Sequence, residues 1–415
     1  MIALHATDLV LPNVRVPASL VARMDKFGGA RDQDCVHGDL LIRNGRAERL
    51  VPARPSDALP RVVMPKLTEC HVHLDKCYTI SRMNGVRGGL QAAIAAQAAD
   101  RVHWTRRDIR SRAMRGLEEL ISSGCGTVRS HVDWGRDDNP NAPSLAWSVL
   151  REMAQECSDR VTLQLAPLTD VEQIADPGVA DAIAREIASG GGTFGVFVFD
   201  QADRRKGIRQ AFEAADRYGL ALDFHVDEGL DDRLDGLEII ADLAIETGFQ
   251  GPVLCGHACK LMNLDPESLK ILSEKLVLSG IAVAALPAAN LFLQGRAAGT
   301  PDRRGVTRIR ELCAAGVPVA VGTDNVQDAF CPLGRHDPRQ SLALAVLAAH
   351  LDPPLGSHFP MITISARRAL GLAPCHVDGA AAEDLILFDA ATTSDMLAGV
   401  SPPKGISAAF QGECA

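Results

Sequence analysis

The sequence predicts an α/β fold, a (β/α)8 TIM barrel with a small β-sandwich domain formed by both termini. Three observations support this prediction. Eight short, continuously apolar segments recur along the middle of the chain, stretches with helical periodicity separate them, and glycine follows several of those stretches. Continuously apolar segments are typical of parallel strands that are covered on both faces, and their alternation with helices favours a parallel barrel. A doubly wound open sheet is the alternative fold.

The expected strands follow one another at intervals of roughly 30 residues, the size of a βα unit with its loops. They are Arg61–Leu67, Gly126–Val132, Val161–Pro167, Thr193–Phe199, Leu220–Val226, Pro252–Gly256, Gly280–Leu286 and Val317–Thr323. Helical spacing covers Asp108–Ser122, Ser144–Cys157, Ala180–Ser189, Arg204–Tyr218, Leu234–Thr247, Pro266–Leu278 and Arg303–Ala315. The first unit is longer than the others, and we interpret Asp75–Trp104 as an extended active-site loop.

Both ends of the chain have a different pattern. Thr7–Leu11, Asp39–Arg43 and Arg46–Leu50 are expected as strands, and the last two flank an Asn-Gly pair, a strong hairpin signal because both positions tolerate positive φ. Asp384–Asp389 is expected as a further strand. We therefore divide the chain into a discontinuous small β domain, residues 1–60 and 375–415, and a catalytic barrel domain over residues 61–374.

Composition excludes several classes of protein. The 415 residues carry a formal charge of −9 and only 4% aromatic side chains, whereas nucleic-acid binders show basic regions or aromatic stacking faces. The sequence has 11 cysteines without C-x-x-C spacing, no N-terminal signal-peptide pattern, and no apolar run of the roughly 18 residues that span a bilayer. We therefore expect a cytoplasmic protein that binds neither nucleic acid nor membrane.

Histidines gather at the C-terminal ends of the expected strands, which is where a barrel of this kind carries its active site. His71 and His73 follow the first strand, and their spacing of two residues directs both side chains to the same side of an extended chain. His225 and His257 stand at the ends of the fifth and sixth strands, and Asp324 follows the eighth. Together these side chains predict a site for a metal ion.

Carboxylates near these histidines are candidates for proton transfer. Glu228 follows the histidine of the fifth strand by three residues, and a buried carboxyl beside a metal and a substrate can act as a proton shuttle. Asp324 has two possible roles, as a metal ligand and as the acceptor of a proton from a metal-activated water. His131 and Asp133 repeat the two-residue spacing on the second strand. With Arg129, we interpret them as supporting contacts rather than as direct ligands.

Several motifs resemble the amidohydrolase superfamily, and in particular its bacterial cytosine deaminases. They are Pro65–Thr79 (PKLTECHVHLDKCYT), Val128–Asp133 (VRSHVD), His225–Asp232 (HVDEGLDD), Gly256–Ala258 (GHA), Phe292–Arg308 (FLQGRAAGTPDRRGVTR) and Gly322–Gly334 (GTDNVQDAFCPLG). The resemblance spans nearly the whole chain in the right order and includes the terminal β domain. It implies a (β/α)8 barrel with one divalent metal ion per subunit, Fe2+ or Zn2+, a small heterocyclic substrate, and a homo-oligomer.

The resemblance also implies a role for each site residue. The metal ligands are His71, His73, His225 and Asp324, the general acid/base is Glu228, and His257 orients the attacking hydroxide. The implied reaction is hydrolytic deamination of a cytosine-like amino-heterocycle. Hydroxide attacks the amidine carbon, Asp324 accepts the proton of the water, and Glu228 protonates the ring nitrogen and then the departing amine, which leaves as ammonia.

The sequence departs from the cytosine deaminases at positions expected to bind substrate. Gln294 is expected to reach the substrate, and Thr169 stands near the place of a glutamine that reads the pyrimidine amide edge in that family. Phe330 replaces a tryptophan, and Asn325 resembles the branch that hydrolyses N-alkylamino-triazines. Loss of one paired amide can change discrimination by orders of magnitude. The alternative function is therefore cleavage of another C–N bond, in an N-alkylamino-triazine, a pterin or a cyclic amide. A noncatalytic binding protein is a third hypothesis, against which the retained metal positions and Glu228 weigh.

Overall fold

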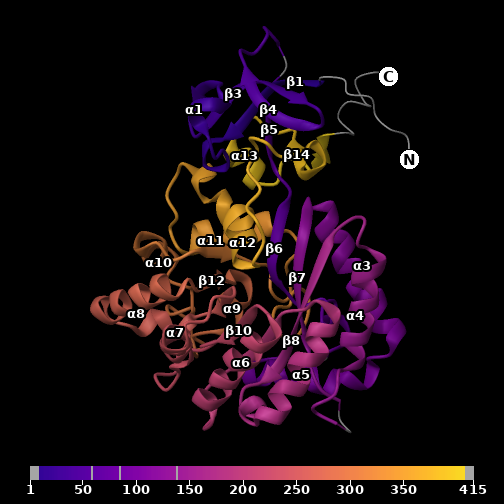
Figure 1. Ribbon diagram of the computed structural model, residues 1–415, viewed down its shortest axis with the longest axis vertical. Coiled ribbons are helices and arrows are strands. Elements are labelled where there is room, and N and C mark those ends of the chain that lie inside the picture. The colour runs from indigo at the N-terminus through magenta and orange to yellow at the C-terminus, as the bar shows by residue number, and fades with distance from the viewer. Residues whose placement is uncertain (1–8, 58, 84–85, 137–138, 407–415) are drawn as a thin grey trace.

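The computed structural model describes residues 9–57, 59–83, 86–136 and 139–406, and its strands form two separate sheets (Figure 1). The larger sheet consists of eight parallel strands in chain order. They are β6 (Leu67–Val72), β7 (Cys125–Asp133), β8 (Thr162–Asp170), β9 (Phe194–Val198), β10 (Leu222–Val226), β11 (Val253–His257), β12 (Ala282–Ala285) and β13 (Val319–Val321). A parallel bridge between Val72 and Asp324 joins the two edges of the sheet at its carboxyl end. The predicted TIM-barrel fold is confirmed.

Helices lie between successive strands and after the last one, β13, and they surround the barrel (Figure 1). They include α3 (Arg106–Ser122), α4 (Leu145–Glu156), α5 (Pro177–Gly190), α6 (Arg204–Tyr218), α7 (Gly236–Thr247), α8 (Pro266–Ser279), α9 (Pro287–Leu293), α10 (Ile309–Ala315), α11 (Pro338–Ala348) and α12 (Ile364–Ala369). Gly219 and Gly280, directly after α6 and α8, take the left-handed conformation that lets the chain turn back towards the next strand. Every residue of β10 and β11 is buried, as expected for strands covered on both faces.

The second sheet contains both ends of the described chain and lies beside the barrel (Figure 1). Its strands are β1 (Leu9–Pro17), β2 (Ala30–Asp32), β3 (Cys35–Arg43), β4 (Arg46–Val51), β5 (Arg61–Pro65), β14 (Leu385–Phe388) and β15 (Pro403–Gly405). Asn44 and Gly45 have φ values of 51° and 73° and join β3 to β4, as the hairpin signal predicts. The first two residues of the expected strand at 7–11 lie outside the described residues, and β1 begins at Leu9.

One barrel strand is predicted wrongly. The sequence places the first barrel strand at Arg61–Leu67, whereas Arg61–Pro65 is β5, which pairs with β1 and β14 of the second sheet. The barrel begins with β6 at Leu67. Both strands are apolar and only Lys66 separates them, so apolar periodicity does not distinguish one strand from two. We propose to move the first domain boundary from residue 60 to Lys66; the rest of the predicted division stays a prediction.

The segment predicted as an extended active-site loop, Asp75–Trp104, contains a helix. This helix, α2 (Leu90–Asp100), is built mainly of alanine, the residue with the highest intrinsic helix propensity. Trp104 follows it and donates a hydrogen bond from Nε1 to Asp100. The first βα unit therefore places an additional helical layer over the barrel before α3 begins.

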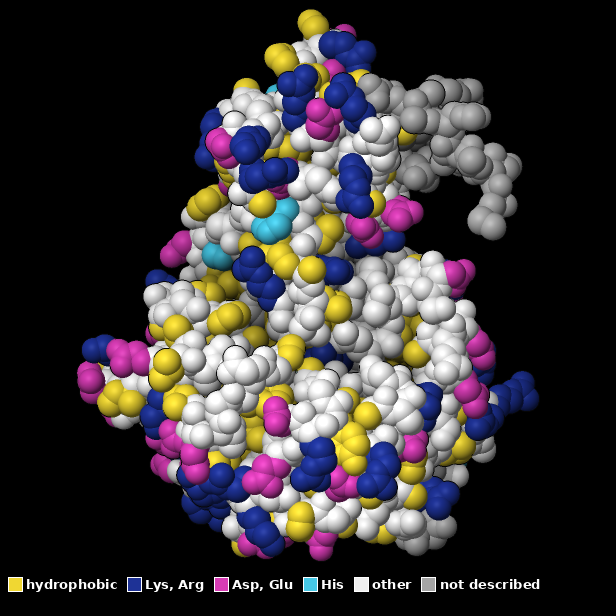
Figure 2. Space-filling model, viewed as in Figure 1, with side chains coloured by type: hydrophobic (Ala, Val, Ile, Leu, Met, Phe, Trp, Pro, Cys, Tyr) yellow, Lys and Arg dark blue, Asp and Glu magenta, His cyan; other side chains and the backbone are white. Residues whose placement is uncertain are grey.

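The face of the molecule drawn in Figure 2 shows mixed charge. On the face in Figure 2, lysine and arginine side chains alternate with aspartate and glutamate side chains over the barrel, and hydrophobic side chains are scattered. Among the described residues, no helix combines the length and the apolar character that crossing a membrane requires.

Candidate active site

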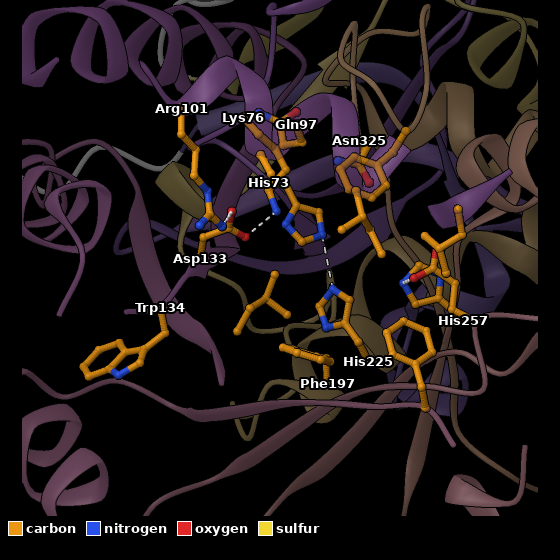
Figure 3. A pocket seen from close by; sticks show the side chains of 17 residues that line it. His73, Lys76, Gln97, Arg101, Asp133, Trp134, Phe197, His225, His257 and Asn325 are labelled. Atoms are coloured by element: carbon orange, nitrogen blue, oxygen red, sulfur yellow. Dashed lines mark hydrogen bonds and ion pairs between the residues drawn. The ribbon is translucent and has the colours of Figure 1, made fainter. Parts of the chain in front are cut away.

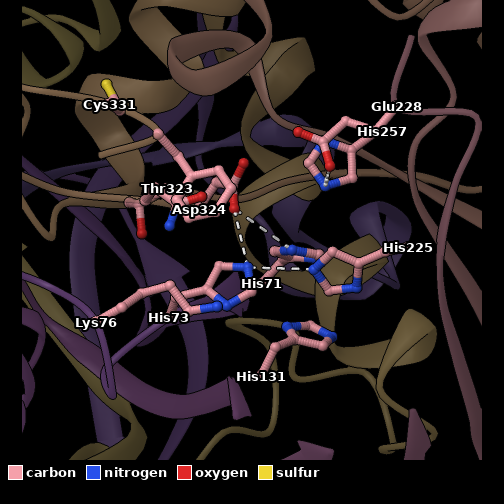
Figure 4. A network of polar contacts seen from close by, with 12 residues as sticks. His71, His73, Lys76, His131, His225, Glu228, His257, Thr323, Asp324 and Cys331 are labelled. Carbon is pink, nitrogen blue, oxygen red and sulfur yellow. Dashed lines mark hydrogen bonds and ion pairs between the residues drawn. The ribbon is translucent and has the colours of Figure 1, made fainter. Parts of the chain in front are cut away.

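Side chains from β6, β7, β10, β11 and the segment after β13 meet at the carboxyl ends of the barrel strands (Figure 4). Two overlapping groups have potential ligand atoms within 4.8 Å of one another. The first contains His71, His73, His131 and His225, and the second contains His71, His257 and Asp324. All of these side chains are buried. The structure thus brings the sequence-predicted donors together and adds His131 to them.

Asp324 connects the last strand of the barrel to the histidines of the first. Its Oδ1 lies 3.3 Å from His73 Nε2 and 3.6 Å from His71 Nε2, and His225 Nε2 lies 3.1 Å from His73 Nε2. The backbone N–H of Asp324 donates to the carbonyl of His71 at 2.8 Å. Asp324 has a φ of 58°, a left-handed conformation that aspartate tolerates better than most residues.

These donors fit a divalent metal ion. Both ring nitrogens of His71, Nδ1 of His73 and of His225, and both carboxylate oxygens of Asp324 are buried without a hydrogen-bond partner among the described residues, an arrangement that costs free energy unless a partner binds. Burial is the main cause that lowers the pKa of all three imidazoles well below the usual value. The imidazoles are then neutral, which is the form that binds metal. Burial also raises the pKa of Asp324 to about 7, and a bound cation favours its carboxylate form.

Glu69 supports the donors on the first strand. It precedes His71 by two residues, and its buried carboxylate accepts the backbone N–H of His71 at 2.9 Å and that of Thr323 at 3.1 Å. Glu69 therefore ties β6 to the segment that carries Asp324. Sequence reasoning missed this residue, although the signal was present: a carboxylate two residues before a strand-end histidine lies on the same side of the strand.

Asp223 supports the donors on the fifth strand in the same way. It precedes His225 by two residues and is fully buried. Its carboxylate accepts a hydrogen bond from Arg129 at 2.9 Å and lies 3.0 Å from Nε2 of His131. The sequence predicted supporting contacts for Arg129 and His131, but Asp223, the carboxylate between them, was missed.

Glu228 and His257 lie across from the imidazole cluster (Figure 4). Oε2 of Glu228 lies 3.7 Å from Nε2 of His257, and Nδ1 of His257 lies 3.1 Å from Oδ1 of Asn290. Burial raises the pKa of Glu228 to about 8, so the carboxyl group keeps its proton near neutral pH. A carboxylic acid with a raised pKa is suited to give a proton to a reacting group.

A cavity of about 340 Å3 opens beside these residues (Figure 3). Its inner wall is formed by His73, His225, Glu228 and His257. The aromatic lining residues are Trp134, Phe197, Phe199 and Phe330, and the other polar lining residues are Lys76, Gln97, Arg101, Asp133 and Asn325. The volume and the mainly apolar lining with a few polar groups are typical of small-molecule sites.

One carboxylate holds the two cationic side chains of the cavity wall. Asp133 accepts a hydrogen bond from Lys76 Nζ at 2.6 Å and another from Arg101 at 2.8 Å (Figure 3). The backbone N–H of Asp133 donates to Asp75 at 2.9 Å. Asp133 was expected to make supporting contacts, and the side chains that it contacts are Lys76 and Arg101. Lys76 was missed, although it stands in the same motif as His73.

Two of the expected substrate-binding residues, Asn325 and Phe330, line the cavity. Thr169 does not: it is buried, and its hydroxyl donates to the carbonyl of Gly195 at 2.7 Å. Its neighbour Leu168 lines the cavity instead, because successive residues of a strand project to opposite sides. Thr169 is therefore outside the residues that line this cavity. Gln294 is absent from the lining; it is buried nearby, and its amide donates to the carbonyl of Glu228 at 3.2 Å.

The comparisons with known proteins agree with this geometry. The model of the Amidohydrolase family matches residues 103–375. A pterin deaminase of Rhizobium rhizogenes is 31% identical over 407 residues, which cover 95% of this chain and 91% of that protein. An N-isopropylammelide isopropyl amidohydrolase of a Pseudomonas species is 22% identical and covers 76% of both chains. Among solved structures, 5-methylcytosine deaminase of Klebsiella pneumoniae with bound 5-fluorocytosine has a TM-score of 0.77 and 25% identity, over 95% of this chain and 94% of that chain.

Proposed function

This chain belongs to the amidohydrolase family, whose members use a divalent metal to hydrolyse C–N bonds, and we propose that it is a hydrolytic deaminase of a pterin-like amino-heterocycle. The observation that carries the proposal is the position of the buried Glu228 carboxyl, which lines the same cavity as His73 and His225 and lies 3.7 Å from His257. Burial raises the pKa of this carboxyl to about 8. The similarity to a pterin deaminase over nearly the full length of both chains favours a pterin as the substrate. Cytosine, the substrate type that the sequence motifs imply, is the second candidate, and the structural similarity to 5-methylcytosine deaminase supports it.

The proposed reaction assigns a task to each side chain. His71, His73, His225 and Asp324 hold the metal, for which we propose Fe2+ or Zn2+, because imidazole nitrogens and a carboxylate suit both ions. When bound, the metal acts as a Lewis acid that makes a hydroxide nucleophile available near neutral pH. The cavity places the amidine carbon of the ring next to these donors.

Side chains of the protein carry out the proton transfers. The carboxylate of Asp324 takes a proton from the attacking water. Glu228 gives its proton to the ring nitrogen of the amidine, then takes the proton of the added hydroxyl group and passes it to the amino group, which leaves as ammonia while the carbonyl forms. The proton held by Asp324 then restores the protonated Glu228 carboxyl. His257, held by Asn290 through Nδ1, directs its Nε2 towards the attacking oxygen. The cytoplasmic location and the homo-oligomeric state stay predictions from the sequence.

Ammonia release by the metal-loaded protein tests the proposal. We expect turnover of pterin with the highest kcat/KM in a panel that also contains cytosine, an aminotriazine and an N-alkylamino-triazine. Glu228→Gln should keep its metal and lose about 10²- to 10⁴-fold in kcat, the usual contribution of a positioned acid/base. Glu238→Gln, the same change at an exposed glutamate of α7 paired with Lys275, is the matched control.

Two results would contradict the proposal. Turnover of no panel member by the metal-loaded protein would favour the noncatalytic binding hypothesis. Full activity of the Glu228→Gln variant would remove the residue from the proton-transfer role.

A further inference from the structure

Gln97 is a polar residue on a face of α2 that is otherwise mainly apolar. Leu90, Ile94, Gln97 and Ala98 line the cavity (Figure 3), and their spacing places them along one side of the helix. The Gln97 side chain is only 3% exposed. Neither its Oε1 nor its Nε2 has a hydrogen-bond partner in the part of the chain that the structure describes.

The neighbouring polar groups of the cavity wall differ from Gln97 in this respect. Lys76 and Arg101 both donate to Asp133, and the amide of Asn325 donates to Asp328 at 2.6 Å. A buried amide without a partner costs about 1–3 kcal/mol. The wall of the cavity therefore contains a buried carboxamide, both of whose polar atoms lack a hydrogen-bond partner among the described residues.

We propose that Gln97 is a specificity-determining residue that pairs with a lactam edge of the substrate ring. A lactam presents a ring N–H beside a carbonyl. A glutamine carboxamide presents the complementary pair, because Oε1 accepts from the N–H and Nε2 donates to the carbonyl. This inference rests on the proposed function and narrows its substrate class to amino-heterocycles with a lactam next to the amidine, as in pterins and cytosine.

The third barrel strand offers no alternative group for this edge. The hydroxyl of Thr169 is bonded to Gly195, and Leu168, which lines the cavity at this strand, is apolar. The helix α2, in the long first βα unit, thus supplies the carboxamide, and the same helix lines the cavity.

Gln97→Met tests the inference, because methionine keeps the length of the side chain and removes both polar atoms. The probes are the deaminated ring product, which keeps the lactam, and its O-methylated analogue, in which neither the ring N–H nor the carbonyl remains. Equilibrium binding of both probes to the zinc-loaded protein is measured for the parent, for Gln97→Met and for Gln91→Met. Gln91 is the exposed glutamine of the same helix and provides the matched control.

We expect Gln97→Met to weaken binding of the lactam probe about 10- to 100-fold, the effect of leaving polar groups of the ring unpaired. Binding of the O-methylated probe should change little, and kcat/KM for pterin should fall in parallel with lactam binding. The ligand-free variant should keep or raise its unfolding temperature, because the replaced amide has no partner there.

Equal weakening of both probes would show a structural role and overturn the inference, and so would unchanged binding of the lactam probe. These outcomes are distinct from a failure of the proposed function. If that function is wrong, the parent itself binds neither probe, and the inference falls with it.

Discussion

Gly256 provides the space that the His71 ring occupies, so Gly256→Ala tests how tightly the donor geometry is set. Gly256 lies in β11, in register with His225 of β10. A Cβ atom on Gly256 would lie 2.9 Å from Cε1 and 3.1 Å from Nδ1 of His71. Carbon atoms in contact are normally about 3.5–4.0 Å apart, so the ring or the strand must move by at least about 0.6 Å.

The His71 ring has to absorb most of this movement. The backbone N–H of His71 donates to Glu69, and its carbonyl accepts from Asp324, which holds the main chain from both sides. A displacement of about 0.5 Å is already the tolerance of a preorganised site. Loss of support around a metal ligand typically costs 10- to 100-fold in metal affinity. We expect Gly256→Ala to weaken Zn2+ binding by about that factor, or ~1.4–2.8 kcal/mol.

Competitive titration of the metal-free protein against a chromogenic chelator measures the effect. Gly405→Ala is the control, since Gly405 is exposed in β15 and its added Cβ would have no neighbour within 4 Å. Unchanged zinc affinity in Gly256→Ala would refute the reasoning. In that case the strand, rather than the ring, would have moved, and a lowered unfolding temperature of the metal-free variant would reveal it.

Two further predictions concern stability. Asp223→Asn leaves the buried guanidinium of Arg129 without its carboxylate and should lower the free energy of unfolding, measured by urea denaturation, by about 3–5 kcal/mol. If the isolated charge is the cause, the double variant Arg129→Met/Asp223→Leu should lose less of this free energy than Asp223→Asn does. Hydrogen bonds from His336 and Tyr78 hold the pKa of Glu119 well below its usual range. The Glu119 carboxylate therefore stabilises the fold fully at pH values above its unfolded-state pKa near 4.5. This stabilisation is lost as the pH falls through the lowered pKa of the folded state. The stability difference between the parent and Glu119→Gln should be complete at pH 7 and shrink below about pH 4.5; a difference that stays constant into strong acid would contradict it.

Local sequence patterns predicted the barrel well, since buried parallel strands and amphipathic helices have distinct periodicities. They failed where two strands follow one another without a turn. Arg61–Pro65 and Leu67–Val72 are both apolar, and only their pairing partners, far away in the sequence, assign them to different sheets. The helix α2 was missed because its alanine-rich sequence has little amphipathic contrast. Only the first of these errors concerns information that is not local.

The metal donors were predictable because each one stands at the end of an expected strand. The residues that hold the donors in place were harder to find. Glu69 and Asp223 lie inside strands, where a carboxylate reads as an interruption of an apolar run until its partners are known. No sequence pattern pointed to Gln97 as a candidate site residue, because its proposed role depends on a cavity that α2 lines only in the folded chain.

The bridge between Val72 and Asp324 also has a consequence for folding, because it joins the first strand of the barrel to the segment after the last. It joins residues about 250 positions apart, and closing a loop of that length costs on the order of 5 kcal/mol of chain entropy. Contacts of such high sequence separation form slowly. His71 and His73 lie on one side of this seam and Asp324 on the other, so the donor set is complete only when the last gap of the barrel has closed. An ion held by both sides therefore opposes reopening of the seam and slows unfolding, while the rate of folding stays set by the chain.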